Sequence, residues 1–202
     1  MRLIKYYILF FIVLNSCKKS EFKDENLVSK KLIQNVFVNK EKLKLDQTKG
    51  LWLYKDKPFN GYSFKLHEND SISEKTAFYN GKREGESFMF FDDGSVKRKA
   101  LYVDNKLQGK KLNYDKNGNL ISETNYVNGK LQGVQKVWYA SGQLAKKRNL
   151  NQGLEEGLQQ AWLENGAIYV NYEAKNGRIF GMQRANLCYQ LKNEKIEERK
   201  KI

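Results

Sequence analysis

The sequence contains few of the residues that usually build catalytic, metal-binding or disulfide-bonded sites. Its 202 residues include one proline, one histidine and two cysteines. The two cysteines, Cys17 and Cys188, allow neither a disulfide framework nor a CxxC metal site, and Cys188 is better interpreted as a small buried apolar residue. A nucleophilic triad could use only His67, which we interpret as a surface residue of a strand. We therefore expect no metal, no cofactor and no enzymatic activity.

Other patterns typical of active sites are also missing. Paired carboxylates occur at Asp92-Asp93 and Glu155-Glu156, but both pairs fall at or beside expected hairpin turns, where acidic residues are ordinarily solvated. The glycines form neither a GxGxxG motif nor a Walker loop, because no helical pattern follows any of them. The sequence thus favours a binding or scaffolding protein over an enzyme.

Long hydrophobic runs are absent as well. The apolar run Tyr6–Leu14 covers nine residues, which is too short to span a bilayer. It follows the basic residues Arg2 and Lys5 and precedes the small residue Ser16, which is the arrangement of a secretory leader.

The end of this leader carries a lipid-attachment signal. Leu14-Asn15-Ser16-Cys17 resembles the lipobox of bacterial lipoproteins, although Asn15 stands where the motif more often has a small or β-branched residue. The resemblance implies a signal peptide over residues 1–16 and a lipid attached to Cys17, which would tether the protein to a membrane. An ordinary secretory signal cut nearby and an uncut anchor remain open as alternatives.

The remaining chain divides into three parts. Residues 17–49 are polar and rich in lysine and are predicted to form a tether; their apolar residues fit a short helix or a strand equally well. Residues 50–190 are predicted to form a repeat array. Residues 191–202 have alternating charges that suggest a solvated helix or tail.

Negative charge is scarce relative to positive charge. Lysine and arginine number 37 against 23 acidic residues, a formal net charge of +14. Such an excess indicates anionic surroundings, although genomic base bias would produce it too. An exported protein would meet phospholipid or anionic envelope polymers first, so nucleic acid is not expected as a partner.

Two basic triplets are the candidate anion-binding residues. They are Lys97-Arg98-Lys99 and Lys146-Lys147-Arg148, on second strands two repeats apart. Strand alternation sends Lys97, Lys99 and Lys147 to one face, and Arg98, Lys146 and Arg148 to the other. Neither face holds all six, so a solvated outer surface is the alternative interpretation.

Glycine, in contrast, follows a fixed period. Glycines recur every 24 residues at Gly61, Gly85, Gly109, Gly133, Gly157 and Gly181. We number the residues of each repeat from its glycine, which is position 0. Turn dipeptides then fall at positions 8–9 and 19–20. The first set is Asn69-Asp70, Asp93-Gly94, Asn117-Gly118, Ser141-Gly142 and Asn165-Gly166; the second is Asn80-Gly81, Asp104-Asn105, Asn128-Gly129, Gln152-Gly153 and Asn176-Gly177. Asn-Gly and Asp-Gly favour type I′ turns, so each repeat is predicted to be two strands and two such turns.

Large apolar residues keep the same register. Position 5 holds Leu66, Phe90, Tyr114, Trp138 and Trp162; position 11 holds Ile72, Val96, Leu120, Leu144 and Ile168; position 17 holds Phe78, Tyr102, Tyr126, Leu150 and Ala174. Because side chains alternate along a strand, positions 11 and 17 are predicted to share one apolar face. Without a helical layer to cover it, part of this face would be available to a partner.

These segments resemble a known repeat. Tyr126–Gly133 and Trp138–Leu144 are similar to MORN repeats, specifically the bacterial variant of the YwqK-like antitoxin family. The similarity covers roughly Gly50 to Gly181 and departs at Asp70 and Asn105, which replace turn glycines. It implies an all-β fold, an elongated single-layer antiparallel meander of about five 24-residue hairpin repeats.

These expectations define a function. The protein is predicted to be a lipoprotein of the cell envelope, anchored at the bacterial outer membrane, whose non-catalytic sheet binds or scaffolds a protein or an envelope polymer. The family label implies an alternative, an antitoxin or immunity-like protein that binds and neutralises a toxin.

Overall fold

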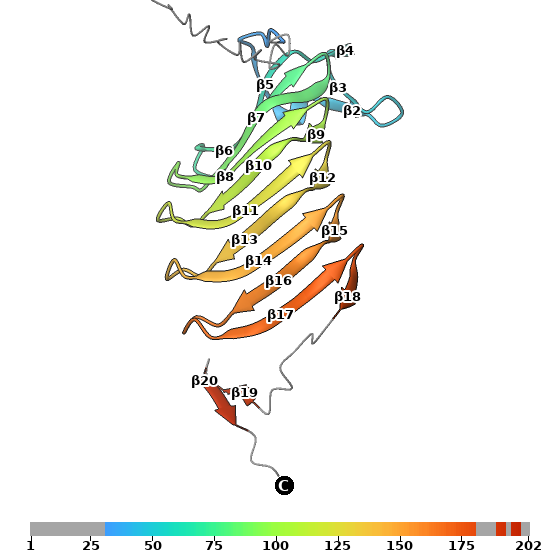
Figure 1. The fold of residues 1–202 in the computed structure, drawn as a ribbon. Coiled ribbons are helices and arrows are strands. Elements are labelled where there is room, and N and C mark those ends of the chain that lie inside the picture. Colours follow the sequence, from blue (N-terminus) through green and yellow to red (C-terminus); the bar gives the residue numbers. More distant parts are fainter. Residues whose placement is uncertain (1–30, 181–188, 193–194, 199–202) are drawn as a thin grey trace, which may run out of the picture. The chain divides into compact units, whose positions relative to one another are not determined.

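The computed structural model describes residues 31–180, 189–192 and 195–198, and almost all of the regular structure in these residues is strand. A 15-stranded sheet, the main sheet, contains all five hairpin repeats in chain order (Figure 1). The predicted all-β antiparallel meander is therefore confirmed. None of the described helices has the length and apolar character needed to cross a membrane.

The strands of the main sheet follow the 24-residue period. Their bounds are β1 Phe37–Asn39, β5 Gly61–Leu66, β6 Ile72–Tyr79, β7 Lys82–Phe90, β8 Val96–Val103, β9 Lys106–Leu107, β10 Gly109–Tyr114, β11 Leu120–Val127, β12 Lys130–Leu131, β13 Gly133–Trp138, β14 Leu144–Asn151, β15 Leu154–Glu155, β16 Gly157–Trp162, β17 Ile168–Lys175 and β18 Arg178–Phe180. All neighbouring strands are antiparallel except β1, which pairs in parallel with β5.

The second turn of each repeat is a type I′ turn, as predicted. Both central residues have positive φ in all five cases, for example 52° at Asn128 and 81° at Gly129. These are the backbone angles that Asn and Gly tolerate best. The short strands β9, β12, β15 and β18 follow these turns and pair back on the strand before them.

The first turn differs from the prediction. Position 9 has positive φ, from 63° at Asp70 to 85° at Gly166, but position 8 does not. In the first repeat the Asp70 N–H donates to the His67 carbonyl (3.1 Å) and the His67 N–H donates to the Ser71 carbonyl (2.8 Å). This is a three-residue loop with a type I turn and a G1 bulge, and the predicted type I′ turn was wrong here. Asn-Gly and Asp-Gly satisfy either turn, so the dipeptide alone does not distinguish them.

Each second strand also contains one extra residue. Lys65 lies opposite Glu74. Leu66 lies opposite Ile72, which leaves Ser73 as a bulge, and the other four repeats have the same register shift. One extra residue reverses the alternation of side chains, so positions 11 and 17 lie on opposite faces. The prediction that they share a face was wrong.

The main sheet consequently has two different faces. Positions 1, 3, 5, 11 and 14 share what we call the aromatic face, and positions 2, 4, 13, 15 and 17 share what we call the polar face. Apolar side chains are thus divided between both faces and do not form a single apolar surface.

Consecutive repeats are joined at their second turns. A side-chain oxygen at position 23 accepts a hydrogen bond from the backbone N–H at position 19 of the next repeat. The pairs are Glu84 with Asp104 (2.9 Å), Gln108 with Asn128 (2.9 Å), Gln132 with Gln152 (3.0 Å) and Glu156 with Asn176 (2.7 Å). Because four successive pairs of repeats make this bond, it holds the second turns of neighbouring repeats in one constant register.

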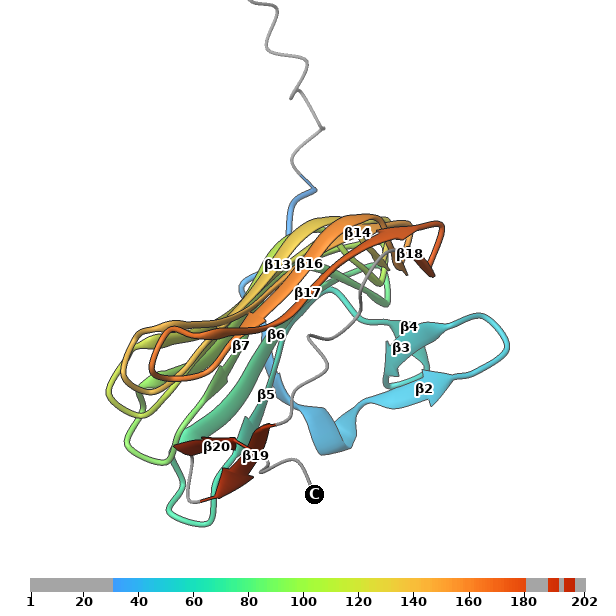
Figure 2. The same cartoon turned by 60° about the horizontal axis from the view of Figure 1, so that its bottom comes forward.

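Residues before the array cover its first repeat. Beside β1 they form the short helix η1 Lys40–Lys42 and a three-stranded sheet of β2 Lys44–Asp46, β3 Leu51–Tyr54 and β4 Lys57–Pro58. These strands lie on one side of the bent main sheet (Figure 2). Residues 32–49, within the segment predicted as a tether, thus contain strands and core residues, and the strand interpretation of Val36-Phe37-Val38 is correct at Phe37–Asn39.

The main hydrophobic core lies between this segment and the polar face. Val38, Leu43, Phe59 and Phe78 are buried together, and Phe78 is 1% exposed. The rings of Phe59 and Phe78 are 5.7 Å apart, and Trp52 meets Phe78 edge-on at 6.1 Å. Full burial of one such side chain stabilises a fold by about 2 to 3 kcal/mol, so this end of the sheet is firmly closed.

The C-terminal segment contains strands where the sequence suggested a solvated helix or tail. β19 Tyr189–Lys192 and β20 Lys195–Glu198 form an antiparallel hairpin. The helical alternative is wrong for these residues. Alternating charges fit one side of a hairpin as well as they fit a helix, so they do not separate the two.

Candidate functional site

The aromatic face carries the most distinctive surface of the array. Large side chains at position 5 lie opposite those at position 11, as in the pairs Phe90 with Val96 and Trp138 with Leu144. Phe88, Phe90, Tyr114, Trp138 and Trp162 are all half-buried, so each ring is partly accessible. The face therefore offers a row of rings across successive hairpins.

A shallow pocket interrupts this row between the second and third repeats. Phe88, Val96, Lys99, Tyr114 and Gly118 line a volume of about 260 Å³. Phe88 stacks on Phe90 with ring centres 5.9 Å apart. The Lys99 ammonium lies 5.4 Å from the centre of the Phe88 ring and 2.6 Å from the Glu86 carboxylate. The pocket thus combines ring walls with a lysine whose charge an acidic neighbour partly balances.

Lysines also cover other rings near this face. The Lys97 and Lys116 ammonium groups lie 5.4 Å and 5.8 Å from the centre of the Phe91 ring. At the first repeat, Lys75 lies 5.0 Å from the ring of Tyr62 and 5.2 Å from that of Phe37. Such cation–π contacts keep lysine charges at the surface beside apolar rings. An anionic partner with apolar parts would match this combination.

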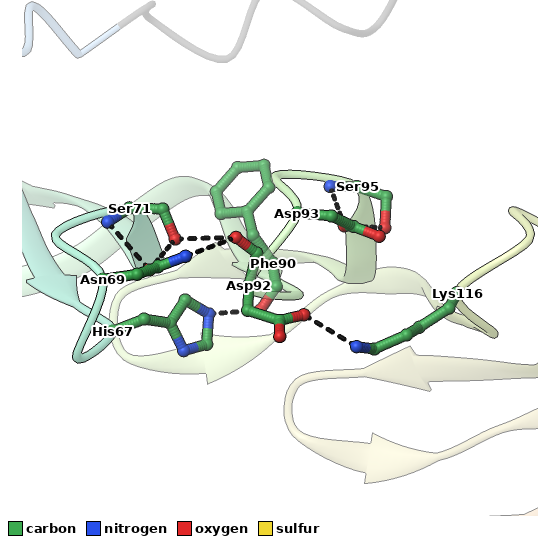
Figure 3. Close-up of polar contacts among 8 residues, drawn as sticks. All are labelled: His67, Asn69, Ser71, Phe90, Asp92, Asp93, Ser95 and Lys116. Atoms are coloured by element: carbon green, nitrogen blue, oxygen red, sulfur yellow. Dashed lines mark hydrogen bonds and ion pairs between the residues drawn. The ribbon is translucent and has the colours of Figure 1, made fainter.

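The first turns form a polar edge that is saturated by its own hydrogen bonds (Figure 3). His67 contacts the Phe90 carbonyl through Nε2 at 3.1 Å, and the Tyr139 hydroxyl makes the equivalent bond to the Trp162 carbonyl at 2.8 Å. Asn69 and Ser71 both donate to the Asp92 carbonyl at 3.0 Å. His67 therefore connects one repeat to the next.

The paired carboxylates of this edge belong to its turns. Lys116 lies 2.7 Å from Asp92 and, by its hydrogen bond and charge, lowers the pKa of that carboxyl. Hydrogen bonds from the Ser95 hydroxyl and N–H lower the pKa of Asp93. A general acid needs a raised pKa, so both groups suit turn formation better than acid catalysis.

The second pair, Glu155-Glu156, makes different contacts. Glu155 accepts a hydrogen bond from the Tyr172 hydroxyl at 2.7 Å and lies 3.7 Å from Arg148. Glu156 accepts from the Asn176 N–H. Burial and the Glu155 carboxylate raise the pKa of Tyr172 to about 12. Both glutamates thus hold the fourth and fifth repeats together.

The structure does not bring the two basic triplets together. They lie on β8 and β14, separated by four strand spacings, or roughly 19 Å. Register puts Lys99 and Lys147 on the aromatic face and Arg98, Lys146 and Arg148 on the polar face, with Lys97 at a bulge. Arg148 donates to Gln135 at 2.8 Å and pairs with Glu155, so its charge is already engaged.

Sequence reasoning missed Lys111, which the structure brings close to Arg98. Both lie on the polar face, and burial together with the Arg98 charge lowers the pKa of Lys111. Lys111 has only Lys110 as a basic neighbour in sequence, so strand pairing was needed to reveal its approach to Arg98. The predicted lipid site Cys17, the signal peptide over residues 1–16 and Cys188 lie outside the described residues. Within the described residues, no group of three potential metal ligands occurs.

Comparison with known families finds a match to three consecutive repeats. Residues 83–104, 107–128 and 131–152 match the MORN repeat variant. Each matched segment runs from two residues before a repeat glycine to the next type I′ turn, and together they contain the pocket at Phe88, Lys99 and Tyr114. MORN repeats are binding repeats for proteins or membranes. No curated protein matches the chain.

Proposed function

We propose that this protein is a lipid-tethered binding module of the cell envelope, anchored at the bacterial outer membrane through Cys17. Its aromatic face binds a protein or polymer partner. The observation that carries the proposal is the row of half-buried rings, with lysines beside them, that continues from hairpin to hairpin. A repeated surface of this kind suits an extended partner, because each repeat offers a similar contact and weak contacts add up along the array.

The partner is expected to carry acidic groups. Lysines at the pocket and beside Phe91 present positive charge. The rings offer apolar surface that is dehydrated when the partner binds. Aromatic residues with charged neighbours dominate many binding interfaces. Charge attraction would orient the partner, and burial of the rings would supply most of the affinity.

The binding face is tested by partner recovery from detergent-solubilised envelopes. Lys99→Glu combined with Tyr114→Ser reverses the charge of the pocket and removes one wall; Lys65→Glu, an exposed lysine on the polar face, is the matched control. We expect the double variant to recover little partner and the control to recover the wild-type amount. Equal recovery by all three proteins would contradict use of this face. A recovered partner that is a toxin inhibited by this protein would establish the antitoxin alternative instead.

The tether is tested separately by the intact mass of membrane-extracted protein, wild type beside Cys17→Ala. We expect a wild-type chain that begins at Cys17 and carries acyl groups, and a variant without them. An unmodified wild-type chain would refute the anchor and leave the binding face untouched.

A further inference from the structure

A continuous row of side chains crosses the polar face at right angles to the strands. It consists of the residues at positions 2 and 15, which lie opposite each other in every repeat: Ser63, Thr76, Ser87, Ala100, Lys111, Thr124, Gln135, Arg148, Gln159 and Tyr172. Most of these side chains are polar, and several are buried, including Thr76, Ser87, Thr124 and Gln159. Buried polar groups need hydrogen-bond partners, so the row can be inspected for satisfied and unsatisfied members.

Most of the row satisfies itself. The Thr76 and Ser87 hydroxyls are 2.8 Å apart, and Gln135 donates to Thr124 at 3.2 Å. Arg148 donates to Gln135, and Tyr172 donates to Glu155. The charge of Arg148 is therefore shared between an amide oxygen and a carboxylate.

Two members of the row are exceptions. The Ser63 hydroxyl is buried and has no hydrogen-bond partner among the described residues, and Lys111 is the exception that carries a charge. Its row neighbours are Ala100, which has no acceptor, and Thr124, whose hydroxyl already accepts from Gln135. Arg98 lies opposite Asn113, so Arg98 and Lys111 are diagonal neighbours, roughly 7 Å apart at Cβ. Among the described residues, no carboxylate pairs with either cation. Two half-buried positive charges thus face each other without an anion, and burial and Arg98 both lower the pKa of Lys111.

Other half-buried charges of the polar face have opposite partners. Glu74, at the same position in the first repeat as Arg98 in the second, lies 2.5 Å from Lys40. Arg148 lies 3.7 Å from Glu155. Around Arg98 and Lys111 the facing groups are neutral: Asn113, which donates to Ser122, and the tyrosines Tyr102 and Tyr126 on the adjoining positions. The site has positive charge and hydroxyl groups but no negative charge.

We propose that Arg98 and Lys111 form a binding site for one oxyanion, a phosphate or a carboxylate group, on the polar face between the second and third repeats. A guanidinium binds such a group through two parallel hydrogen bonds, an ammonium adds a point charge, and the half-buried position reduces screening by water. The site is distinct from the aromatic face and does not depend on the tether at Cys17.

The test follows the lysine side-chain resonances of the full chain by NMR. Sodium phosphate or sodium acetate is added to the protein at constant ionic strength. We expect a saturable change at Lys111 and a raised pKa of its ammonium when the oxyanion binds. Arg98→Gln and Lys111→Met should each weaken binding roughly tenfold or more. The matched control is Lys110→Met, which removes the adjacent lysine on the opposite face of the same strand and should bind as the wild type does.

Arg98→Gln has a second readout that needs no ligand. Removal of the neighbouring positive charge should raise the pKa of Lys111 in the folded protein. If phosphate binds more tightly than acetate, the natural ligand carries a phosphate group; if acetate binds more tightly, it carries a carboxylate. The two titrations can be compared because both use sodium salts. A linear change without saturation, or equal losses in the test and control variants, would overturn the proposal.

Discussion

The two ends of the main sheet are built from the same repeat but differ in how they are closed. At the first repeat, Phe78 is 1% exposed beneath Phe59 and Trp52. At β18, the last strand of the main sheet, Ile179 and Phe180 are 40% and 53% exposed. Glu84 and Phe180 share position 23 but are 9% and 53% exposed, so burial depends on what packs against a repeat as well as on the repeat position. In a linear array each terminal repeat lacks one neighbour, and among the described residues the segment before Gly61 takes that place at the first repeat.

The largest effect is expected from the closed end. Phe78→Ala should lower the free energy of unfolding by about 3 to 5 kcal/mol, because it leaves a cavity among Val38, Leu43 and Phe59. Phe180→Ala should change it by less than about 0.5 kcal/mol, since that side chain is mostly in water. Urea denaturation of both variants measures the contrast. Similar losses for the two variants would show that the ends are equally closed.

A smaller difference in the loss of stability is expected between alanine variants of two repeat glycines, Gly61 and Gly133. A Cβ at Gly61 would lie 2.5 Å from the Val36 carbonyl oxygen, whereas nothing lies within 4 Å of one at Gly133. Both have positive φ, so Gly133→Ala should cost about 1 to 2 kcal/mol from backbone strain alone. Gly61→Ala should cost more, because the segment before the array must also move. Thermal unfolding compares the two; a larger loss for Gly133→Ala would count against the close contact.

The smallest effect on stability is expected from Tyr172 in the fifth repeat, and only at alkaline pH. Tyr172 has a pKa raised from 10.0 to about 12 by burial and by its bond to Glu155. Its protonated form is favoured by folding, so its contribution is complete below pH 10 and is lost as the pH rises towards 12. Tyr172→Phe should therefore flatten the loss of stability over this range. The urea midpoint at several alkaline pH values measures it, and parallel curves for both proteins would disprove the role of this hydroxyl.

The sequence predicted the period and one of the two turns correctly. Asn128-Gly129 and its equivalents require two left-handed residues, and few other residue pairs accept both. The first turns and the bulge at Ser73 were missed, because Asn-Gly fits two loop types and an extra strand residue has no sequence signal of its own. That one residue moves Phe78 and Ile72 to opposite faces, so the predicted single apolar face became two surfaces.

Some residues of the candidate sites could likewise be predicted from the sequence, and others could not. Aromatic residues at position 5 were visible as a repeated pattern, and the structure places them on a partly exposed face. The basic triplets attracted attention because their charges are adjacent in sequence, yet adjacent strand residues point to opposite faces. Lys111 stands only beside Lys110 in sequence, and it meets Arg98 because β10 pairs with β8.

The sequence by itself determined the repeat length, the strand order and the type I′ turns, because these follow from local backbone preferences that recur every 24 residues. Tertiary structure alone decided which side chains share a face, that residues 32–60 close the first repeat, and that Arg98 and Lys111 are neighbours. Those features depend on register and on contacts between segments distant in the chain, where one bulge or one packing contact outweighs any local preference.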